Sequence, residues 1–394
     1  MPRVPRPGHR TAPENLETPP TVALPMKARV EKLYKFADPK PDAVVFANSV
    51  DPHLDGGFFW LFDVPSGLFE GSIAIAHPDG ELDLFTSVLE AETARAAARQ
   101  DPHVNVHEFR TAAELEDGMK RILGAARTIG VHHQEITHAG YERLTKALSS
   151  AQWVDVSAAV RRARVTKDPV EIERLAKAAE IGSKVALEIP SLLREGLVER
   201  DLATEMNHRM MQHGAEGPSF ATIVGFGPNS AEPHYFAGGR ALRSGDSMVC
   251  DFGAYSERYA SDITRSFHFG RRDEELKAVH EKVEEAQRAA LATIRDGVPA
   301  KEVHLAAQRV IDASPWKGRF THGLGHSIGL RVHDGWGMNE RSEDQLEEGM
   351  VITVEPGIYL PGHGGVRIED DVLVTKQGYR FLTTAPRSYV EVAA

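Results

Sequence analysis

Paired carboxylates occur in an apolar, strand-like stretch in the second half of the sequence, residues 248–267. Asp251 and Asp262 lie at equal distances from a turn centred on Ser256 and Glu257. In an antiparallel hairpin such residues face each other, with Cβ atoms about 4.5–5.5 Å apart. Two like charges this close in apolar surroundings destabilise a fold unless a cation lies between them. The spacing therefore predicts a cation site, and a metal ion is the natural counter-charge.

A second pair of carboxylates repeats this pattern near the carboxyl end. Glu355 and Glu369 are symmetric about Gly362, which lies in a turn between two strand-like runs. Residues 321–334 add a candidate imidazole ligand, because histidines there alternate with glycines that let the backbone approach a ligand closely. Four carboxylates and one imidazole suit divalent ions such as Mn²⁺, Co²⁺, Fe²⁺ or Zn²⁺. Two bridged ions lower the pKa of a shared water toward neutrality, so the predicted chemistry is hydrolysis.

In the order and spacing of these motifs, residues 165–394 resemble the pita-bread metallopeptidases, the family of prolidase (Xaa-Pro dipeptidase), aminopeptidase P and methionine aminopeptidase. The resemblance implies a site for two divalent metal ions with five ligands: Asp251, Asp262, His326, Glu355 and Glu369. It also implies that Glu355 acts as general base or proton shuttle. By the same resemblance, His234 and His333 contact the scissile peptide and stabilise the tetrahedral intermediate. Arg367 resembles the arginine beside the metal site in the proline-specific members.

Residues 26–164 resemble the creatinase-type domain that prolidases and aminopeptidases P carry and methionine aminopeptidases lack. This architecture implies a proline-specific peptidase that acts on small peptides with proline in the second position. One creatinase-type domain without a third domain favours a dipeptidase that hydrolyses the Xaa-Pro bond. The resemblance also implies a homodimer. It favours Mn²⁺ as the metal and leaves Co²⁺ and Zn²⁺ open.

Two other functions stay open at this point. The first keeps the fold and changes the substrate: an aminopeptidase P that releases the residue before proline from longer peptides, or a hydrolase of another amide or a phosphoester. The second belongs to a different class, a pita-bread module that binds peptides without catalysis. Loss of metal ligands would mark that module, and none of the five implied ligands is missing from the sequence.

A dipeptidase needs a positive group for the prolyl carboxylate of its substrate. In many prolidases an arginine follows shortly after the His-Asp pair, but this sequence has none four residues after His333, and Arg341 is the nearest candidate. Arg367 is a second candidate, with pairing to a ligand carboxylate as its alternative role. His322 is a further candidate for substrate binding, with hydrogen bonding to nearby backbone as its alternative.

The chain that positions these groups has 394 residues, which predicts two or three domains. Its 46 basic and 57 acidic residues give a net charge of −11, which disfavours a broad nucleic-acid-binding face. No apolar run reaches the roughly 18–20 residues of a membrane helix, and no secretory signal opens the chain. The single cysteine, Cys250, cannot form an intramolecular disulfide. We therefore expect a cytoplasmic protein without nucleic-acid or membrane partners.

The predicted fold class is α/β (α+β), a small creatinase-type α/β domain followed by a pseudo-twofold pita-bread catalytic domain. Residues 1–25 hold seven prolines and no apolar periodicity, so we expect a mobile extension, and Met26 is a second candidate for the first residue. In residues 26–164 the apolar pattern predicts helices packed on a mixed sheet. The expected helices span 27–36, 88–99, 112–126 and 138–149, and the expected strands span 43–47, 71–76 and 82–85.

The catalytic domain is expected to begin at a strong helix-start signal. Asp168 is a suitable N-cap, Pro169 takes the first helical position and Glu171 completes a capping box. This helix should run toward residue 187, and further helices are expected at 199–213, 273–294 and 300–313. Residues 193–197, Leu-Arg-Glu-Gly-Leu, match residues 294–298, Ile-Arg-Asp-Gly-Val, each before an amphipathic helix. We interpret this repeat as two related halves that face each other across a cleft.

Overall fold

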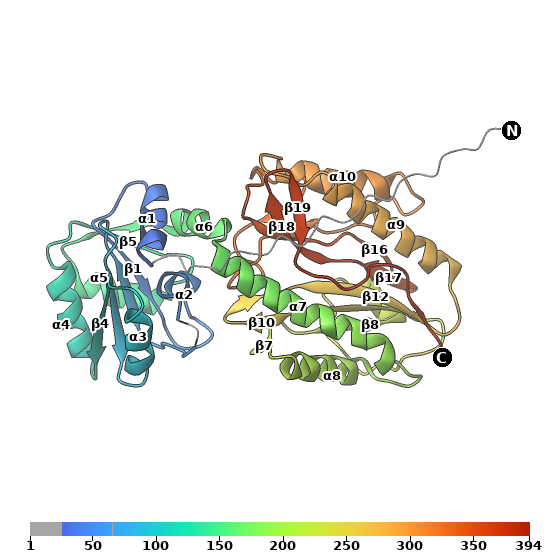
Figure 1. Cartoon of the computed structure of the whole chain (residues 1–394), viewed down its shortest axis with the longest axis horizontal. Helices are drawn as coiled ribbons and strands as arrows, with labels where there is room; N and C mark the ends of the chain where they lie inside the picture. Colours follow the sequence, from blue (N-terminus) through green and yellow to red (C-terminus); the bar gives the residue numbers. More distant parts are fainter. Residues whose placement is uncertain (1–25, 65) are drawn as a thin grey trace.

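The structure is a computed structural model that describes residues 26–64 and 66–394. The predicted proline-rich extension, residues 1–25, lies outside the described residues. Figure 1 shows two bodies, one formed by residues 26–165 and the other by residues 169–394. Among the described helices, none combines the length and the apolar character that a membrane span requires.

The amino-terminal body is a mixed sheet with helices packed against it (Figure 1). Its strands are β1 (Ala43–Ala47), β2 (Ile73–Ala76), β3 (Leu82–Ser87), β4 (Val104–Phe109), β5 (Thr128–Val131) and β6 (Gln152–Asp155), in the spatial order β4-β3-β2-β1-β5-β6. Its helices are α1 (Met26–Phe36), α2 (Gly56–Phe62), α3 (Ala91–Ala98), α4 (Ala112–Leu123), α5 (His138–Ala147) and α6 (Ser157–Val165). Successive residues of β1 enter opposite cores: Phe46 joins residues of α1 and α2, and Val45 joins residues of α4 and α5. Both faces of the sheet are therefore buried at this central strand.

The predicted helices and strands of this body are confirmed apart from their ends, but α2 and α6 are not predicted by the sequence pattern. The sequence of α2 is Gly-Gly-Phe-Phe-Trp-Leu-Phe, and all of its residues are buried. It is apolar on every side, so it lacks the 3.6-residue periodicity that marks an amphipathic helix. Its start is fixed locally instead, because the Asp55 side chain accepts a hydrogen bond from Gly57 N at 2.7 Å.

The second body places two pairs of helices on opposite sides of its strands (Figure 1). One pair is α7 (Pro169–Leu192) and α8 (Glu199–Gln212), and the other is α9 (Glu274–Leu291) and α10 (Ala300–Asp312), with a short 3₁₀ helix η1 (Gly227–Ala231). The strands between α8 and α9 in the sequence are β7 (Gly217–Pro218), β8 (Ile223–Phe226), β9 (Ser247–Phe252), β10 (Ala254–Ser256), β11 (Tyr259–Ala260) and β12 (Ile263–Phe269). The strands after α10 are β13 (Gly325–His326), β14 (Gly337–Met338), β15 (Val351–Val354), β16 (Gly357–Leu360), β17 (Gly364–Arg367), β18 (Asp370–Thr375), β19 (Gly378–Phe381) and β20 (Glu391–Val392).

The junction between the two bodies has the predicted capping box. The Asp168 side chain accepts from Glu171 N at 3.0 Å, and the Glu171 side chain accepts from Asp168 N at 2.9 Å. Arg29 of α1 pairs with Asp168 at 2.9 Å, which connects the first body to the start of α7. The helix continues past its predicted end and includes Pro190 in its last turns.

The two copies of the short repeat have the same local structure, which confirms the predicted relation between the halves. Gly196 and Gly297 both have left-handed φ angles, 81° and 79°. Their N–H groups donate to matching later segments, Leu242 O at 3.0 Å and Leu346 O at 2.8 Å. Helices α8 and α10 then begin three residues after these glycines. Each half therefore contains one turn-and-helix unit and one carboxylate hairpin.

Candidate metal centre

The first pair of carboxylates lies on the hairpin of β9 and β12. Asp251 lies opposite Thr264 and not opposite Asp262, so the predicted direct pairing of the two aspartates is wrong by two residues. The cause is the turn, because Glu257 and Arg258 occupy its central positions with φ angles of 47° and 68°, one residue later than predicted. A shift of two residues keeps both aspartates on one face of the hairpin, and both line the same cavity.

The second pair lies where β15 continues into β16 and β17 into β18. Strands β16 and β17 pair in the register that is symmetric about Gly362, with Gly357 opposite Arg367. Strands β15 and β18 continue this register. Glu355 and Glu369 therefore face each other across the hairpin, and the predicted register is confirmed.

Strand β13 brings His326 between the two hairpins. Gly325 permits this approach, because a Cβ atom there would lie 2.1 Å from the carbonyl oxygen of Thr353. The Thr353 hydroxyl also accepts a hydrogen bond from His326 N at 3.0 Å. His326 Nε2 lies 3.5 Å from Asp262 Oδ2 and 3.6 Å from Glu355 Oε1. Carboxylates from both halves of the body thus surround one imidazole.

All five implied ligands line one cavity of about 610 Å³. One ligand atom from each of Asp262, His326 and Glu369 lies within 4.8 Å of the other two. Three buried oxygens of these five ligands have no hydrogen-bond partner among the described residues: Asp251 Oδ1, Asp262 Oδ1 and Glu369 Oε1. Such oxygens carry a desolvation cost, which a divalent cation offsets for several of them at once. The carboxylate oxygens and imidazole nitrogen therefore fit a divalent metal.

The acidic groups of the cavity have raised pKa values because they are buried side by side. Burial raises the pKa of Glu355 to about 7. Burial and the neighbouring Asp251 charge raise the pKa of Asp262 well above its usual range. Burial and the charge of Asp262 do the same to the pKa of Glu369. A cation among these groups favours their charged forms, so metal binding is expected to release protons.

The next residue along the chain shows that this fold can satisfy a buried carboxylate. Asp370 is fully buried, like Glu369, but it faces the other side of the strand. Its carboxylate accepts from Arg265 at 2.7 Å, from Gln287 at 2.8 Å and from Arg387 at 2.5 Å. Glu369 thus lines the cavity and keeps an unpaired oxygen, whereas its neighbour on the other face of the strand has three partners.

Arg367 is held by the protein on several sides. It pairs with Asp251 Oδ2 at 2.5 Å and donates to Thr264 Oγ1 at 3.0 Å and to the Tyr359 hydroxyl at 2.9 Å. Its side chain is 3% exposed. The structure thus supports the pairing of Arg367 with a ligand carboxylate, and it also places the arginine in the cavity wall.

His322 continues this network on the far side of Tyr359. Its Nε2 lies 2.8 Å from the Tyr359 hydroxyl and its Nδ1 lies 2.7 Å from the carbonyl oxygen of Gly323. Burial and the charge of Arg367 lower the pKa of His322 to about 3, so the ring is neutral. The bonds are satisfied when Nδ1–H donates to Gly323 and Nε2 accepts from Tyr359. Both nitrogens are therefore occupied by protein partners, which favours the backbone-bonding alternative over substrate binding.

His333 and His234 line the cavity in different ways. The His333 ring packs on the His326 ring, with centroids 4.1 Å apart. Burial lowers the pKa of His333 to about 4, and the neighbouring His326 contributes to the decrease. The His234 ring makes no hydrogen bond to any described residue, although the carbonyl of Pro233 accepts one from Arg367 at 3.2 Å. The structure brings both histidines to the carboxylate cluster.

Arg341 does not lie at the site, which corrects its prediction as a substrate contact. It follows β14 in a turn in which Arg341 N donates to Asn339 Oδ1 at 2.8 Å and Asn339 N donates to Ser342 Oγ at 2.9 Å. This turn directs the arginine outward, where its side chain is 90% exposed and lies 3.8 Å from Glu340. Distance along the sequence from His333 gives no information about this direction.

Sequence reasoning misses two polar residues of the centre, Thr264 and Tyr359. The Thr264 hydroxyl donates to Glu369 Oε2 at 2.6 Å and accepts from Arg367. Strand alternation was an available signal for it, because Thr264 lies two residues after Asp262. Tyr359 carries no comparable signal, since its role depends on partners from distant segments. The same holds for the apolar side chains in the cavity wall, which include Phe220, Ile223, Val332 and Phe236.

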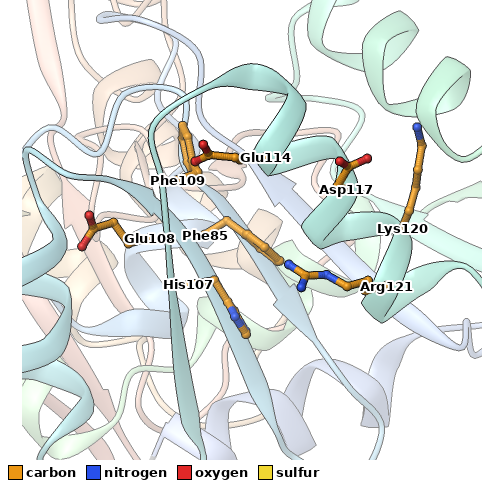
Figure 2. Close-up of a pocket in the computed structure, with 8 residues that line it drawn as sticks. All are labelled: Phe85, His107, Glu108, Phe109, Glu114, Asp117, Lys120 and Arg121. Atoms are coloured by element: carbon orange, nitrogen blue, oxygen red, sulfur yellow. The ribbon is translucent and has the colours of Figure 1, made fainter.

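A second hollow, of about 820 Å³, lies on the amino-terminal sheet beside α4. Figure 2 shows His107 and Phe85 on its strands, and Glu114 and Arg121 among the side chains of the helix. Its acidic and basic groups are exposed and of mixed sign. Within the part of the chain that the structure describes, metal-ligand spacing is found at the Asp262 cluster and not in this hollow.

Two family profiles match the chain. The Creatinase/Prolidase N-terminal domain profile matches residues 58–166, and the Metallopeptidase family M24 profile matches residues 173–376, about half of the chain. The chain belongs to metallopeptidase family M24. The family resemblance, the enzyme class and the fold class predicted from the sequence are thereby confirmed. The predicted boundaries after residues 25 and 164 stay predictions.

Relatives of this M24 metallopeptidase match it over nearly its whole length. It is 33% identical to an Xaa-Pro dipeptidase from Pyrococcus horikoshii over 93% of this chain and 99% of the relative. An X-Pro aminopeptidase from Thermotoga maritima has a TM-score of 0.84 and 33% identity, covering 92% of this chain and 100% of the other. An Xaa-Pro dipeptidase from Bacillus anthracis has a TM-score of 0.85 and 29% identity, covering 93% and 99%. Dipeptidases and an aminopeptidase therefore share this architecture.

Proposed function

We propose that this M24 metallopeptidase hydrolyses the peptide bond before proline in Xaa-Pro dipeptides with the help of two divalent metal ions. The observation that carries the proposal is the cavity in which His326 meets carboxylates with three buried, unpartnered oxygens. The dipeptide preference is supported by two Xaa-Pro dipeptidases from Pyrococcus species, which are 33% and 35% identical to this chain over 93% and 92% of its length.

The residues that would hold the ions are Asp251, Asp262, His326, Glu355 and Glu369. When bound, the ions polarise the scissile carbonyl and make water a nucleophile near neutral pH. Arg367 holds the Asp251 carboxylate in place through their ion pair, and Thr264 orients Glu369 by donating to one of its oxygens. These contacts leave the unpartnered oxygens free for the ions.

Glu355 is the residue that we propose to move the proton. Its pKa of about 7 without metal shows that its carboxylate accepts a proton readily in this environment. It would take the proton of the attacking water and deliver it to the departing prolyl nitrogen. Glu355 Oε1 also lies 3.6 Å from His326 Nε2, at the centre of the ligand cluster.

His234 and His333 are proposed to orient the scissile bond. A neutral imidazole can direct an N–H toward the oxygen on which negative charge develops, and burial keeps His333 neutral at pH 7 by lowering its pKa to about 4. Both rings line the cavity that holds the carboxylates. Each ring would stabilise the tetrahedral state by donating an N–H hydrogen bond to its oxyanion.

The cavity also suits a prolyl residue. Proline has no amide hydrogen to donate and presents a compact apolar ring, which the wall formed by Phe220, Ile223 and Val332 can receive. Arg367 is the cationic side chain of the lining, so we propose it as the group that attracts the prolyl carboxylate. Arg341 has no part in this proposal because its side chain points away from the cavity.

We further propose Mn²⁺ as the native metal, since a mainly carboxylate donor set favours a hard ion. A homodimer is proposed from the resemblance to proline-specific members of the family. A cytoplasmic location is proposed because Cys250 is the single cysteine of the sequence and is buried. We also propose that residues 26–164 and 165–394 are the two domains.

An Xaa-Pro aminopeptidase is the second candidate function, favoured by the structural similarity to the Thermotoga maritima enzyme. The test is a paired assay of the Mn²⁺-loaded protein on an Xaa-Pro dipeptide and the matched Xaa-Pro-Xaa tripeptide, with Asp262→Asn as the metal-site control. Cleavage of the dipeptide alone supports the proposal. Preferred cleavage of the tripeptide moves the protein to the aminopeptidases, and metal-dependent cleavage of neither overturns both.

A further inference from the structure

A buried glutamate outside the metal cavity holds the segment that carries His234. Glu199, the first residue of α8, is 0% exposed. Its Oε1 accepts from Phe226 N and Asn229 Nδ2, both at 2.9 Å. Its Oε2 accepts from the Tyr235 hydroxyl at 2.9 Å and from Gly238 N at 3.2 Å. One carboxylate therefore binds four uncharged donors spread over residues 226–238.

This segment needs an external anchor because His234 has none of its own. The His234 ring makes no hydrogen bond to a described residue, whereas His322 is bonded at both nitrogens and His333 is packed on another ring. On one side of His234, the Pro233 carbonyl accepts from Arg367. On the other side, Tyr235 lines the same cavity and its hydroxyl donates to Glu199 Oε2 at 2.9 Å. His234 is thus positioned by its two neighbours.

The other half of the molecule shows that the fold does not require a glutamate at this place. Residue 199 lies three residues after Gly196, and the equivalent position after Gly297 is Ala300, which also begins a helix and is 0% exposed. The alanine makes the same turn-and-helix unit with no buried charge. Burying a carboxylate costs free energy, so its retention in one half alone calls for a local role.

We propose that Glu199 is a positioning residue, which acts through Tyr235 to fix His234 against the metal cavity. The proposal rests on the function proposed above, because it assigns His234 to the reaction. It adds a residue that contacts no metal ligand and lies behind the cavity lining, which it reaches through Tyr235. In this role Glu199 affects turnover and not substrate affinity, since the Glu199 side chain lies outside the substrate cavity.

The first test is a double-mutant cycle between Tyr235→Phe and His234→Ala, measured on an Xaa-Pro dipeptide. Tyr235→Phe removes one hydroxyl and is expected to lower kcat about tenfold with KM within twofold, because a small displacement of a catalytic group is costly. In the His234→Ala background, Tyr235→Phe is expected to change kcat less than twofold. An equal tenfold loss in both backgrounds would mean that the tyrosine acts independently of His234 and would overturn the proposal.

The second test does not depend on activity. Amide hydrogen exchange of residues 227–238 is compared in the wild-type protein, Glu199→Gln and the matched control Glu188→Gln, whose carboxylate binds Arg209 and His213 on α8 and its end. Faster exchange of this segment in Glu199→Gln alone supports the proposal, and unchanged exchange overturns it. An inactive wild-type protein with faster exchange in Glu199→Gln would overturn the proposed function while leaving the anchor itself in place.

Discussion

The metal cavity and the hollow on the amino-terminal sheet contain similar side chains but differ in how these are hydrated. In the hollow, Glu114 and Asp117 are exposed, so water satisfies their oxygens, and cationic side chains lie on the same helix. In the metal cavity, Asp262 and Glu369 are buried and keep an oxygen without a partner. The larger volume belongs to the hollow, about 820 Å³ against 610 Å³. Withdrawal of charged groups from water, and not cavity size or residue type, distinguishes the reactive site.

The largest difference between a change in the metal cavity and a matched change in the hollow is expected when the proposed proton carrier is removed. Glu355→Gln should lower kcat on an Xaa-Pro dipeptide by about 10³-fold, because general acid–base catalysis contributes about 10²–10⁴-fold. The matched change Glu114→Gln in the hollow should leave kcat within twofold. Initial rates at saturating Mn²⁺ measure both. A Glu355→Gln variant with more than a tenth of wild-type kcat would remove Glu355 from the mechanism.

The next contrast concerns stabilisation by metal. A ligand at about 1,000 times its Kd stabilises a fold by about 4 kcal/mol, so Mn²⁺ should raise the wild-type Tm clearly. Asp262→Asn should lose most of this increase, while its metal-free form should be at least as stable as the metal-free wild type, because a buried like charge is gone. Calorimetric scans with and without Mn²⁺ measure this. The matched control is Asp117→Asn, which changes an aspartate that lines the hollow on the amino-terminal sheet. A normal Mn²⁺ response in Asp262→Asn would contradict the ligand assignment.

The pH dependence of the metal-free protein should reveal the same buried acids. Burial raises the pKa of Glu355 from 4.5 to about 7, so the folded state binds more protons than the unfolded state between these values. The contribution of Glu355 to the free energy of unfolding is therefore fully present below about pH 4.5. It is lost as the pH rises through about 7, by up to about 3 kcal/mol. Urea unfolding from pH 5 to 8 measures the slope, and Glu355→Gln should flatten it. A slope in Glu355→Gln that equals the wild-type slope would contradict the raised pKa of Glu355.

The smallest effect is expected from the arginine that the turn directs outward. Arg341→Ala should change kcat/KM for an Xaa-Pro dipeptide less than twofold, since its side chain is 90% exposed and outside the cavity lining. Steady-state kinetics on the dipeptide measure this. A rise in KM of tenfold or more would show that Arg341 reaches the substrate after all and would restore its predicted role.

Much of the fold could be predicted because local patterns specify it. The capping box at Asp168, the repeat at Gly196 and Gly297 and the register about Gly362 all depend on residues close together in sequence. The register of the first hairpin could not be placed in this way. Its turn has Glu257 and Arg258 at positive φ, without the Asn-Gly signal that usually marks such a turn.

The candidate site could be predicted more fully than the side chains around it. Even with the first hairpin misplaced by two residues, strand alternation kept its aspartates on the cavity face. Strand alternation also marks Thr264, but Tyr359 and Glu199 were not predictable, because they act across tertiary contacts that no short pattern encodes. The exposure of Arg341 follows from a turn of its own segment and cannot be inferred from its distance to His333.

The central claim, that the buried cluster holds two divalent ions, is tested most directly by counting them. Metal-free protein is equilibrated with Mn²⁺, desalted and analysed for metal and protein together. The account predicts two ions per chain in the wild-type protein and in the hollow variant Asp117→Asn, and fewer in Asp262→Asn. A wild-type count near zero, or an unchanged count in Asp262→Asn, would contradict it.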